Sequence, residues 1–445
     1  MKKYLYLYLF PFVFLSACSS FLEVEPRTSI SGDQVINDET SAKAALNGVY
    51  AALRSYYSVN YQSIAYLSGD NVEWTGSQSQ IQEFINHKVN AENATLATTW
   101  NGIYKSIDRA NNVIQDLTDY DEGNISDALK ENLRGQAYAI RALNYFDLLR
   151  VWGGVPIVTA PTAKIGENMG IRRSSADQVY ARVLEDLDTA EGLLDNSTDR
   201  TALTKKSVLA LKARYYLYRQ DWQRAIQYAD RLLSDPDYEL LDPYDSFFKN
   251  DVTETRESIF ELFYSANEPN PHRGQWQPQT NGGTRQWAPN AALVKLLSSP
   301  ETGGARAALI ARDNQGRWYG NLYYRDPAKD PTYIVRIAEI LLIRAEASAE
   351  LGDYTQALTD LNRIRSRAAL KARPSSTDKD QILSWIADER RLEFAFEAHR
   401  WFDLVRTGRA KQVLGIQEDF RLLLPIPYSQ LLADPALEQN PGYSR

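Results

Sequence analysis

The sequence predicts a mainly α-helical protein that is built from paired helices and interrupted by one large, loop-rich insertion. Apolar residues recur at steps of three and four in several long segments, which is the period of one helix face. Two segments, 209–234 and 341–366, repeat the same pattern without gaps. Residues 236–332 lack a long helical period and hold nine of the 18 prolines. We therefore expect a helical scaffold over about 35–235 and 333–445, with an insertion between them.

The first residues of the chain resemble a bacterial export signal. Lys2 and Lys3 form a positive start, an apolar run covers 5–15, and Ser16-Ala17 supply the small residues that a signal peptidase needs. The apolar run is about a dozen residues long, whereas a helix that spans a membrane takes about 20. We therefore expect residues 1–17 to be removed from the mature chain.

Cys18 is the single cysteine of the chain, and one thiol cannot form an internal disulfide. The stretch Leu15-Ser16-Ala17-Cys18 resembles the bacterial lipobox, in which the cysteine is acylated and becomes the new N-terminus. Several acyl chains give stable anchoring at about 0.8 kcal/mol per buried CH₂. We expect Cys18 to be lipidated and 18–34 to form a polar tether. The alternative is an ordinary secretory signal with a cysteine nearby by chance.

The composition of the whole chain is that of a soluble, acidic protein, and we expect 35–445 to form one body. Hydrophobic residues make up 44% and charged residues 24%, which is ordinary for a globular protein. The formal net charge is −7, and loss of Lys2 and Lys3 makes it −7 − 2 = −9. Because an acidic surface repels phosphate, nucleic acid and anionic lipid headgroups are poor partners. The 27 Tyr and 9 Trp suit binding surfaces as well as cores.

The first clear helices follow from periodicity and from residues that begin or end helices. In 133–150 the apolar side chains stand at helical steps, and Gly153-Gly154 mark the end of the helix. A loop with Pro and Gly follows over 153–173. Ser174-Ser175-Ala176-Asp177 then resembles a capping box, which predicts a second long helix over 176–194.

The segments 209–234 and 341–366 share more than an amphipathic pattern. Each has a helix, a turn in which aspartate precedes an aromatic residue, and a second helix with alanine three residues further on. This resembles the tetratricopeptide unit. Because a stable stack needs at least three units, we expect the helix pairs 133–150/176–194 and 381–397/401–412 to complete it. The alternative is that any two amphipathic hairpins look alike.

Two loop regions are rich in aromatic and polar side chains. One is the insertion at 236–332, and the other is 66–80, where the helical period also lapses. A long insert without regular structure inside a compact protein is usually functional, disordered or misread. Its aromatic content argues against disorder. We therefore expect these two regions to carry the function.

No motif in the sequence predicts a catalytic or metal centre. The chain contains no GxGxxG after a strand, no GxxxxGK[ST], no GxSxG and no HExxH. The three histidines, at 87, 272 and 399, are scattered, and no zinc-ligand spacing occurs. A two-carboxylate glycosidase needs only acids that the fold brings together, so that alternative stays open. We expect no enzyme activity, no cofactor and no metal.

The most densely charged segment is 388–408, DERRLEFAFEAHRWFDLVRTG. Glu389, Glu393 and Glu397 recur every four residues among arginines and aromatic side chains. One interpretation is a catalytic site. We favour a helix with one aromatic-aliphatic face and internal ion pairs, because side chains at this spacing are neighbours on a helix.

The same segment resembles the SusD/RagB family of bacterial outer-membrane nutrient-binding lipoproteins. The family pattern E-R-R-x-E-F/L-x-x-E-x-x-R-W-x-D-L-x-R is matched by 389–406. The C-terminal LLLPIPYSQLLADPALEQNPGY is similar to the closing Ile-Pro and Gln-Asn-Pro-Gly-Tyr of the family, here 426–427 and 439–443. Two further stretches, RALNYFDLLRVWGGVPIVT at 141–159 and AALNGVYAAL at 44–53, are also typical.

This resemblance implies a SusD-like helical fold with tetratricopeptide-like repeats, whose helices serve largely as a transporter-facing scaffold. It implies a lipid-anchored location on the outer face of the outer membrane. It also implies a SusC-like TonB-dependent transporter as partner, whose barrel the protein caps like a lid. Family members hand over glycans or, in some branches, peptides, and no catalytic activity is implied.

The loop residues predict the kind of ligand. A sugar ring has an apolar C–H face and a rim of hydroxyls, so its site needs flat aromatic rings beside hydrogen-bonding side chains. We expect four tryptophans to act as stacking platforms: Trp74, Trp276, Trp287 and Trp318. We expect four polar residues to bond the hydroxyls: Asp70, Asn71, Gln275 and Arg285.

The sequence therefore predicts non-catalytic binding of an oligosaccharide and its delivery to a transporter. Three alternatives stay open: a peptide-binding lipoprotein, a repeat scaffold whose only ligand is the transporter, and a surface glycosidase. For each tryptophan the alternative is packing inside a loop.

Overall fold

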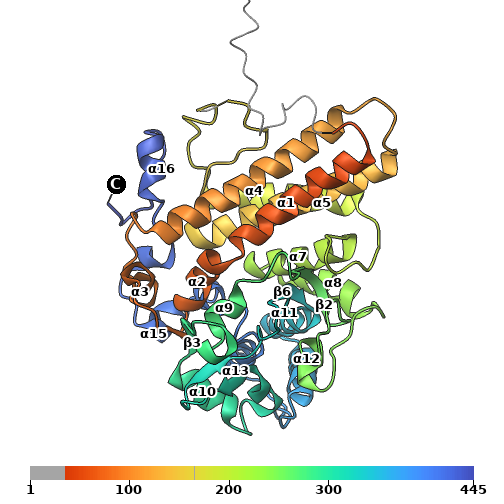
Figure 1. The fold of residues 1–445 in the computed structure, drawn as a ribbon. Helices are drawn as coiled ribbons and strands as arrows, with labels where there is room; N and C mark the ends of the chain where they lie inside the picture. Colours follow the sequence, from red (N-terminus) through yellow and green to blue (C-terminus); the bar gives the residue numbers. More distant parts are fainter. Residues whose placement is uncertain (1–35, 165, 445) are drawn as a thin grey trace, which may run out of the picture.

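The computed structural model describes residues 36–164 and 166–444 (Figure 1). The predicted export signal, Cys18 and the tether at 18–34 lie outside the described residues. The structure is 54% helix and 5% strand, which confirms the mainly α-helical fold.

The α-helices are α1 (Glu39–Tyr56), α2 (Val59–Leu67), α3 (Ser79–Ile85), α4 (Ala94–Asp119), α5 (Asp127–Trp152), α6 (Ala176–Leu193), α7 (Lys205–Tyr218), α8 (Trp222–Leu233), α9 (His272–Trp276), α10 (Ala291–Ser298), α11 (Ile337–Glu350), α12 (Tyr354–Arg367), α13 (Lys379–Glu393), α14 (Arg400–Arg406), α15 (Ala410–Leu414) and α16 (Tyr428–Ala433). The strands are β1 (Val72–Trp74), β2 (Ser258–Leu262), β3 (Trp287–Pro289), β4 (Ile310–Arg312), β5 (Trp318–Gly320) and β6 (Thr332–Arg336).

Helices α1, α4 and α5 lie alongside one another at one end of the molecule, and α6 packs along α5 (Figure 1). Helix α5 begins earlier than predicted because Ser126 caps it, its hydroxyl accepting from the Leu129 N–H at 3.4 Å. It ends as predicted, at Gly153, whose φ of +74° suits glycine. The capping box of α6 uses Ser175 and Gln178, one position later than predicted.

The two predicted helix–turn–helix repeats are the hairpins α7–α8 and α11–α12, and their turns have the same geometry. Asp221 caps α8 at φ −86°, ψ 79°, and Asp353 caps α12 at φ −84°, ψ 74°. Ala225 and Ala357 are fully buried, so the paired helices pack closely. Helix α11 contacts both α8 and α12, which stacks one hairpin on the next. The tetratricopeptide-like repeats are therefore confirmed.

The last predicted helix pair, 381–397/401–412, differs from the prediction. Helix α13 ends at Glu393, and the following helix is divided into α14 and α15 at Gly408, whose φ is +69°. Between α13 and α14 the chain turns, and Phe396 packs on Trp276 with ring centroids 4.7 Å apart. Tertiary contacts outweigh the helical period in this segment.

The insertion at 236–332 contains more regular structure than its sequence suggests. Its strand β2 pairs in antiparallel register with β6, which leads directly into α11. Its strand β3 pairs with β1 from the 66–80 loop, and β4 pairs with β5 as a hairpin. The two predicted loop regions are thus joined by a strand pair.

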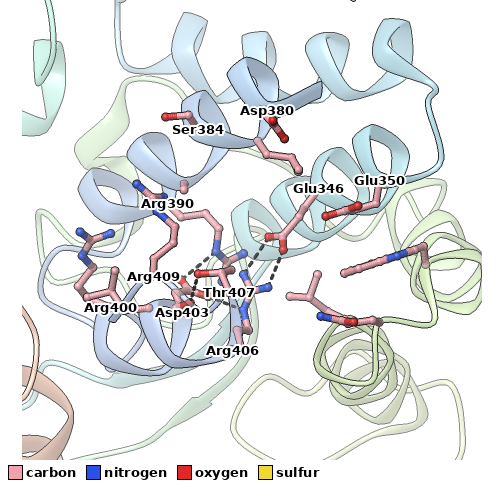
Figure 2. A pocket seen from close by; sticks show the side chains of 16 residues that line it. Glu346, Glu350, Asp380, Ser384, Arg390, Arg400, Asp403, Arg406, Thr407 and Arg409 are labelled. Carbon is pink, nitrogen blue, oxygen red and sulfur yellow. Dashed lines mark hydrogen bonds and ion pairs between the residues drawn. The ribbon is translucent and has the colours of Figure 1, made fainter. Parts of the chain in front are cut away.

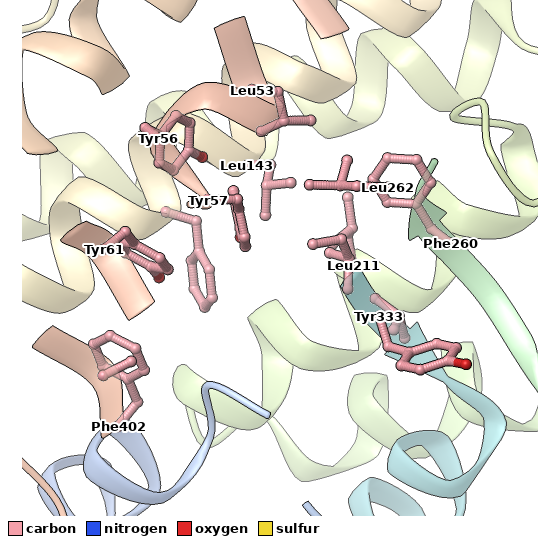
Figure 3. Close-up of a cluster of buried hydrophobic side chains, with 14 of the residues drawn as sticks. Leu53, Tyr56, Tyr57, Tyr61, Leu143, Leu211, Phe260, Leu262, Tyr333 and Phe402 are labelled. Carbon is pink, nitrogen blue, oxygen red and sulfur yellow. The ribbon is translucent and has the colours of Figure 1, made fainter. Parts of the chain in front are cut away.

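The main hydrophobic core lies where the N-terminal helices, the first repeat and strands β2 and β6 meet (Figure 3). Its central side chains are Leu53, Tyr56, Tyr57, Tyr61, Leu143, Leu211, Phe260, Leu262, Tyr333 and Phe402. The tyrosine hydroxyls are satisfied inside the core, because Tyr56 and Tyr61 donate to the two oxygens of Asp147 at 2.8 and 2.9 Å. This core unites the helical scaffold with the insertion.

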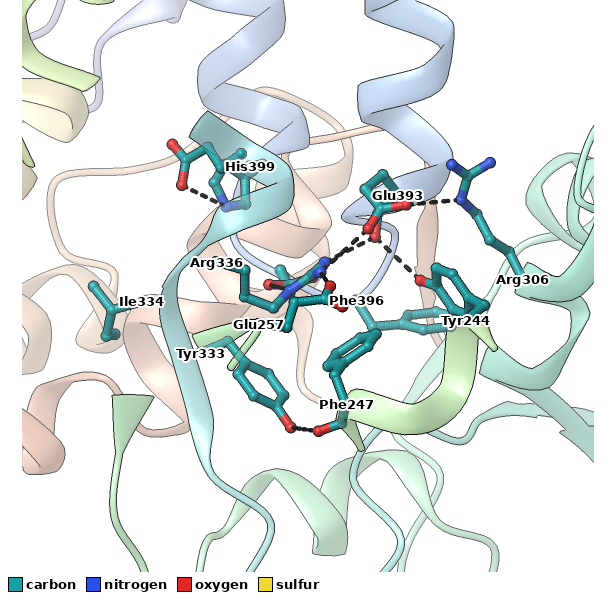
Figure 4. Close-up of polar contacts among 12 residues, drawn as sticks. Tyr244, Phe247, Glu257, Arg306, Tyr333, Ile334, Arg336, Glu393, Phe396 and His399 are labelled. Carbon is teal, nitrogen blue, oxygen red and sulfur yellow. Dashed lines mark hydrogen bonds and ion pairs between the residues drawn. The ribbon is translucent and has the colours of Figure 1, made fainter. Parts of the chain in front are cut away.

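A buried ion-pair network lies beside this core (Figure 4). Arg336 is fully buried and bonds Glu257 at 2.5 Å, Glu397 at 2.6 Å and Glu393 at 3.2 Å. The network also includes Arg306, Arg365, Arg367 and Glu389. The three glutamates of 388–408 are thus held by arginines from other parts of the chain, which favours the structural interpretation of that segment.

Within the ranges that the structure describes, every helix falls short of the length and apolarity that a membrane span requires. The same residues include no group of three or more His, Cys, Asp or Glu that could hold a metal ion.

Candidate ligand-binding site

Four of the eight predicted ligand-binding residues lie on segments that come together around β1, β3 and the β4–β5 hairpin. We call this region the tryptophan–arginine surface and define it by Trp74, Thr75, Gln275, Arg285, Arg312 and Trp318. Trp74 stands opposite Trp287 in the β1–β3 pair, and β5 packs beside β3. Hydrogen bonds join the segments, because Thr75 donates its hydroxyl to the Arg285 carbonyl at 2.5 Å and Arg285 Nε donates to the Trp318 carbonyl at 2.7 Å.

Gln275 lies on helix α9, which is bonded to the segment that carries Arg285. The carbonyl of Gly274 accepts from the Thr284 N–H at 2.7 Å, and that of Gln277 accepts from the Arg285 N–H at 2.9 Å. These bonds hold the end of α9 against the chain that carries Arg285. The Gln275 Oε1 is buried and has no hydrogen-bond partner in the described part of the chain.

Two of the predicted platforms, Trp276 and Trp287, lie beneath the strands and are both 0% exposed. Their rings contact each other with centroids 5.5 Å apart, and both contact Tyr66. A Cβ atom added at Gly320 would lie 2.6 Å from the Trp276 ring, so the backbone of β5 rests directly on this indole. These two rings have no face open to a sugar; they form the floor on which the strands are packed.

The other two predicted platforms, Trp74 and Trp318, are half-buried at the edge of the core. The chain after Trp74 passes close to its ring, because a Cβ atom at Gly76 would lie 2.4 Å from the indole Cζ2. The Trp74 Nε1 is enclosed and lacks an acceptor among the described residues. Each indole is thus partly held by packing and partly exposed, as a stacking platform needs to be.

Arg285 is held in an unusual backbone conformation, with φ +50°. A non-glycine residue in this region costs of order 1–3 kcal/mol, and such residues gather at ligand-binding sites. Its Nε is bonded to the Trp318 carbonyl, while its two terminal nitrogens have no partner among the described residues. Partial burial, and then the nearby Arg317, lower the pKa of the Arg285 guanidinium. Arginine nevertheless stays charged in proteins.

Arg312 belongs to this surface and was missed by the sequence analysis. It pairs with Trp318 across the β4–β5 hairpin, and its guanidinium lies 4.2 Å from the Trp318 ring centroid. The hairpin turn is rigid, because Asp313 Oδ1 accepts from the Gln315 and Arg317 N–H groups, both at 2.9 Å. The Asp-Asn-Gln-Gly turn at 313–316 could have indicated Arg312, because the turn sets the register that places Arg312 opposite Trp318.

The remaining predicted residues, Asp70 and Asn71, are engaged away from this surface. Asp70 accepts from Arg400 at 2.6 and 3.1 Å and pairs with Arg391 at 3.1 Å. Asn71 is 2% exposed, and its Oδ1 accepts from Arg391 Nε at 2.8 Å. These two residues attach the α2–β1 connection to α13 and α14, so they support β1 rather than face a ligand.

A separate cavity of about 310 Å³ lies between α11, α13, α14 and the α7–α8 hairpin (Figure 2). Its charges largely neutralise one another. Arg406 bonds both oxygens of Glu346 at 2.6 and 2.8 Å, and Arg390 bonds Asp403 at 2.9 Å. Although burial opposes it, the two guanidiniums hold the pKa of Asp403 below its usual range. This cavity combines ion pairs with apolar walls and lacks the paired, half-open indoles of the tryptophan–arginine surface.

Together, the stacked helical hairpins and the aromatic and arginine side chains define a helical-repeat protein with a candidate ligand-binding surface where its insertion meets the 66–80 region. Comparison with family models identifies it further. The model described as "Starch-binding associating with outer membrane" matches residues 20–217, and the model described as "SusD family" matches 263–420. The chain belongs to the SusD/RagB family, and the description of the first model associates this family with the outer membrane.

Relatives of known sequence match nearly the whole chain. SusD-like protein P38 of Formosa agariphila is 29% identical, over 96% of each chain. A SusD-like protein of Bacteroides ovatus is 24% identical, over 88% of this chain and 80% of its own.

Solved structures have the same fold. A laminarin-binding SusD-like protein superimposes with a TM-score of 0.81 at 26% identity, covering 92% of this chain and 100% of its own. A SusD superfamily protein from Bacteroides vulgatus has a TM-score of 0.84 at 21% identity, covering 92% and 99%.

Proposed function

We propose that the protein binds an oligosaccharide without catalysis and that the tryptophan–arginine surface is its binding site. The observation that carries this proposal is the pair of half-buried indoles, Trp74 and Trp318, joined through Thr75 and Arg285 by direct hydrogen bonds. The rings offer apolar faces to the C–H face of a sugar, and the neighbouring side chains offer donors and acceptors to its hydroxyls. Because packing holds the rings in place, little entropy is lost on binding.

The relatives support the same class of ligand. One similar solved structure is a laminarin-binding protein, at 26% identity over its full length. Laminarin itself is not thereby assigned to this chain, because linkage and sugar identity depend on side chains at the surface. The family relationship supports a binding protein, and the site offers stacking and hydrogen bonding as its chemistry.

The double variant Trp74→Ala, Trp318→Ala is expected to weaken glycan binding by roughly tenfold or more, since each aromatic contact contributes about 0.5–1.5 kcal/mol. Binding is measured by calorimetry with a glycan selected from an array of neutral and acidic polysaccharides. The glycan should be recovered unshortened, with no release of reducing sugar.

The matched control is Trp385→Ala, because Trp385 is also half-buried but lies on α13, away from this surface. Both variants are checked for native helix content by circular dichroism. Equal affinity of the double variant and the control would overturn the site assignment. Binding of peptides in place of every glycan would overturn the ligand class.

We further propose that Cys18 anchors the protein by lipid to the outer membrane, facing the exterior, and that the body caps a SusC-like TonB-dependent transporter as a lid. The family association with the outer membrane supports this location. Tethering raises the effective concentration of a binding protein beside its partner, which suits a protein that only captures and delivers.

Cys18→Ala is expected to release the protein from the membrane fraction while the purified protein keeps its glycan affinity. The reason is that acyl chains supply the anchoring free energy and the tryptophan–arginine surface supplies the binding. Cell fractionation followed by immunoblotting measures the first effect, and calorimetry the second. A variant that stays in the membrane fraction, or that loses glycan affinity as well, contradicts this division of roles.

A further inference from the structure

We infer that the tryptophan–arginine surface takes an acidic glycan, one whose sugars carry carboxylate or sulfate groups. This inference rests on the proposed function and adds the substrate class. It is carried by two arginines near Trp318: Arg285 donates its Nε to the Trp318 carbonyl, and the Arg312 guanidinium lies over the Trp318 ring. Neither has an ion-pair partner among the described residues. A sugar bound at Trp318 would therefore lie close to two cations.

Hydrogen bonds, and not an ion pair, hold Arg285 in place. Its Nε is held by the Trp318 carbonyl at 2.7 Å and its backbone carbonyl by Thr75 at 2.5 Å. The two terminal nitrogens remain unpaired, and together they form the planar fork that binds carboxylate or sulfate oxygens in pairs. A neutral sugar would use only part of this donor capacity.

Arg312 supplies the second charge. Arg312 is exposed, and its guanidinium lies 4.2 Å from the Trp318 ring centroid. Its side chain forms no hydrogen bond or ion pair with a described residue. The neighbouring cation, Arg317, is different, because its Nε bonds Asp313 Oδ2 at 2.8 Å in the hairpin turn. Arg285 and Arg312 thus lack an ion-pair partner among the described residues, whereas Arg317 has one in Asp313.

The acids near this surface do not cancel the two charges. Glu73 and Asp313 both act on Arg285 through space, but neither forms an ion pair with it in the described part of the chain, and Asp313 pairs with Arg317. Across the whole chain the net charge is −7. Because such a protein repels polyanions at a distance, its recognition of an acidic glycan would depend on a few locally placed cations. Binding is then expected to weaken with added salt, which screens exposed charges.

The experiment compares glycans that share a backbone but differ in charge. Polygalacturonate is paired with its methyl-esterified form, and κ-carrageenan with its desulfated form. Calorimetry of the purified protein at low and high ionic strength should show that at least one charged glycan binds more tightly than its neutral counterpart. Arg285→Gln and Arg312→Gln should each weaken that binding about tenfold, the size expected for loss of a charge-assisted hydrogen bond or pair.

The matched control is Arg409→Gln. The Arg409 side chain forms no hydrogen bond or ion pair with a described residue, and it lines the cavity of Figure 2 and not the tryptophan–arginine surface. This variant should bind the charged glycan like the wild type. An equal loss in all three variants would reveal nonspecific polyanion binding and overturn the inference. Thermal melting of each variant confirms that it is folded.

The outcome separates this inference from the proposed function. If the protein binds neutral glycans through Trp74 and Trp318, and Arg285→Gln and Arg312→Gln bind them like the wild type, the acidic class is wrong and the glycan-binding site stands. If the double tryptophan variant binds every glycan like the wild type, the site itself is wrong. Preference for the charged member, lost in both arginine variants and kept in Arg409→Gln, is the expected result.

Discussion

Arg336→Met is expected to lower the free energy of unfolding by about 3–5 kcal/mol or more, the range measured when one partner of a buried ion pair is removed. Arg336 is fully buried and holds Glu257, Glu393 and Glu397 together (Figure 4). Methionine would fill the space but leave these carboxylates without their shared cation. The cost arises from uncompensated charge and not from lost volume.

Urea unfolding followed by circular dichroism measures this loss. The control is Arg421→Met, because Arg421 pairs with the half-exposed Glu418 and donates to the His87 carbonyl at 3.1 Å, so that variant should lose much less stability. Adding Glu397→Gln to Arg336→Met should recover part of the stability, since it removes one of the stranded charges. If Arg336→Met is no less stable than Arg421→Met, the network does not stabilise the fold in the way described. If the variant is too unstable to purify, loss of soluble protein that Glu397→Gln partly restores gives the same answer.

Stability is expected to fall as the solution becomes acidic, in two stages. Burial lowers the pKa of His272 to about 4 and that of His399 to about 3. Although burial opposes it, Arg367, Arg306 and Arg336 lower the pKa of Glu393 to about 2. A group whose pKa is lowered in the folded protein binds its proton more readily in the unfolded chain. Acid therefore favours unfolding, first between about pH 6.5 and 4 through the histidines and then below about pH 4.5 through Glu393.

Urea unfolding over a series of pH values tests this. The wild type should lose free energy of unfolding as pH falls through the histidine window, and His272→Gln should show a shallower slope there. Asp330, whose pKa burial raises to about 6, acts in the opposite direction, so the measured slope is a net effect. Stability that is constant, or that rises, from pH 6.5 to 4 would contradict the burial of two neutral histidines.

Part of the candidate site could be predicted because its residue types stand out in the sequence. The 66–80 and 236–332 regions stand out by aromatic and polar residues in the absence of a helical period, and the segments that carry Trp74, Gln275, Arg285 and Trp318 do come together. Trp276 and Trp287 have the same local signal but are buried. The exposure of a ring depends on which distant segment packs over it, and the local sequence around the ring does not indicate that segment.

Polar residues show the same limit. Asp70 and Asn71 follow α2 in a loop, as a ligand-binding residue would, yet their partners are Arg391 and Arg400 at the opposite end of the sequence. Arg312 gave no signal of its own, because its role comes from standing opposite Trp318 in a hairpin.

Short-range period, capping and local motifs were enough to predict the helical class, the repeated hairpins and the family. Tertiary packing was needed to separate the tryptophans of the floor from those of the surface. It also pairs Glu389, Glu393 and Glu397 with distant arginines. The difference arises because burial and charge pairing depend on residues brought together from far apart in the chain, whereas helical period and caps depend on neighbours.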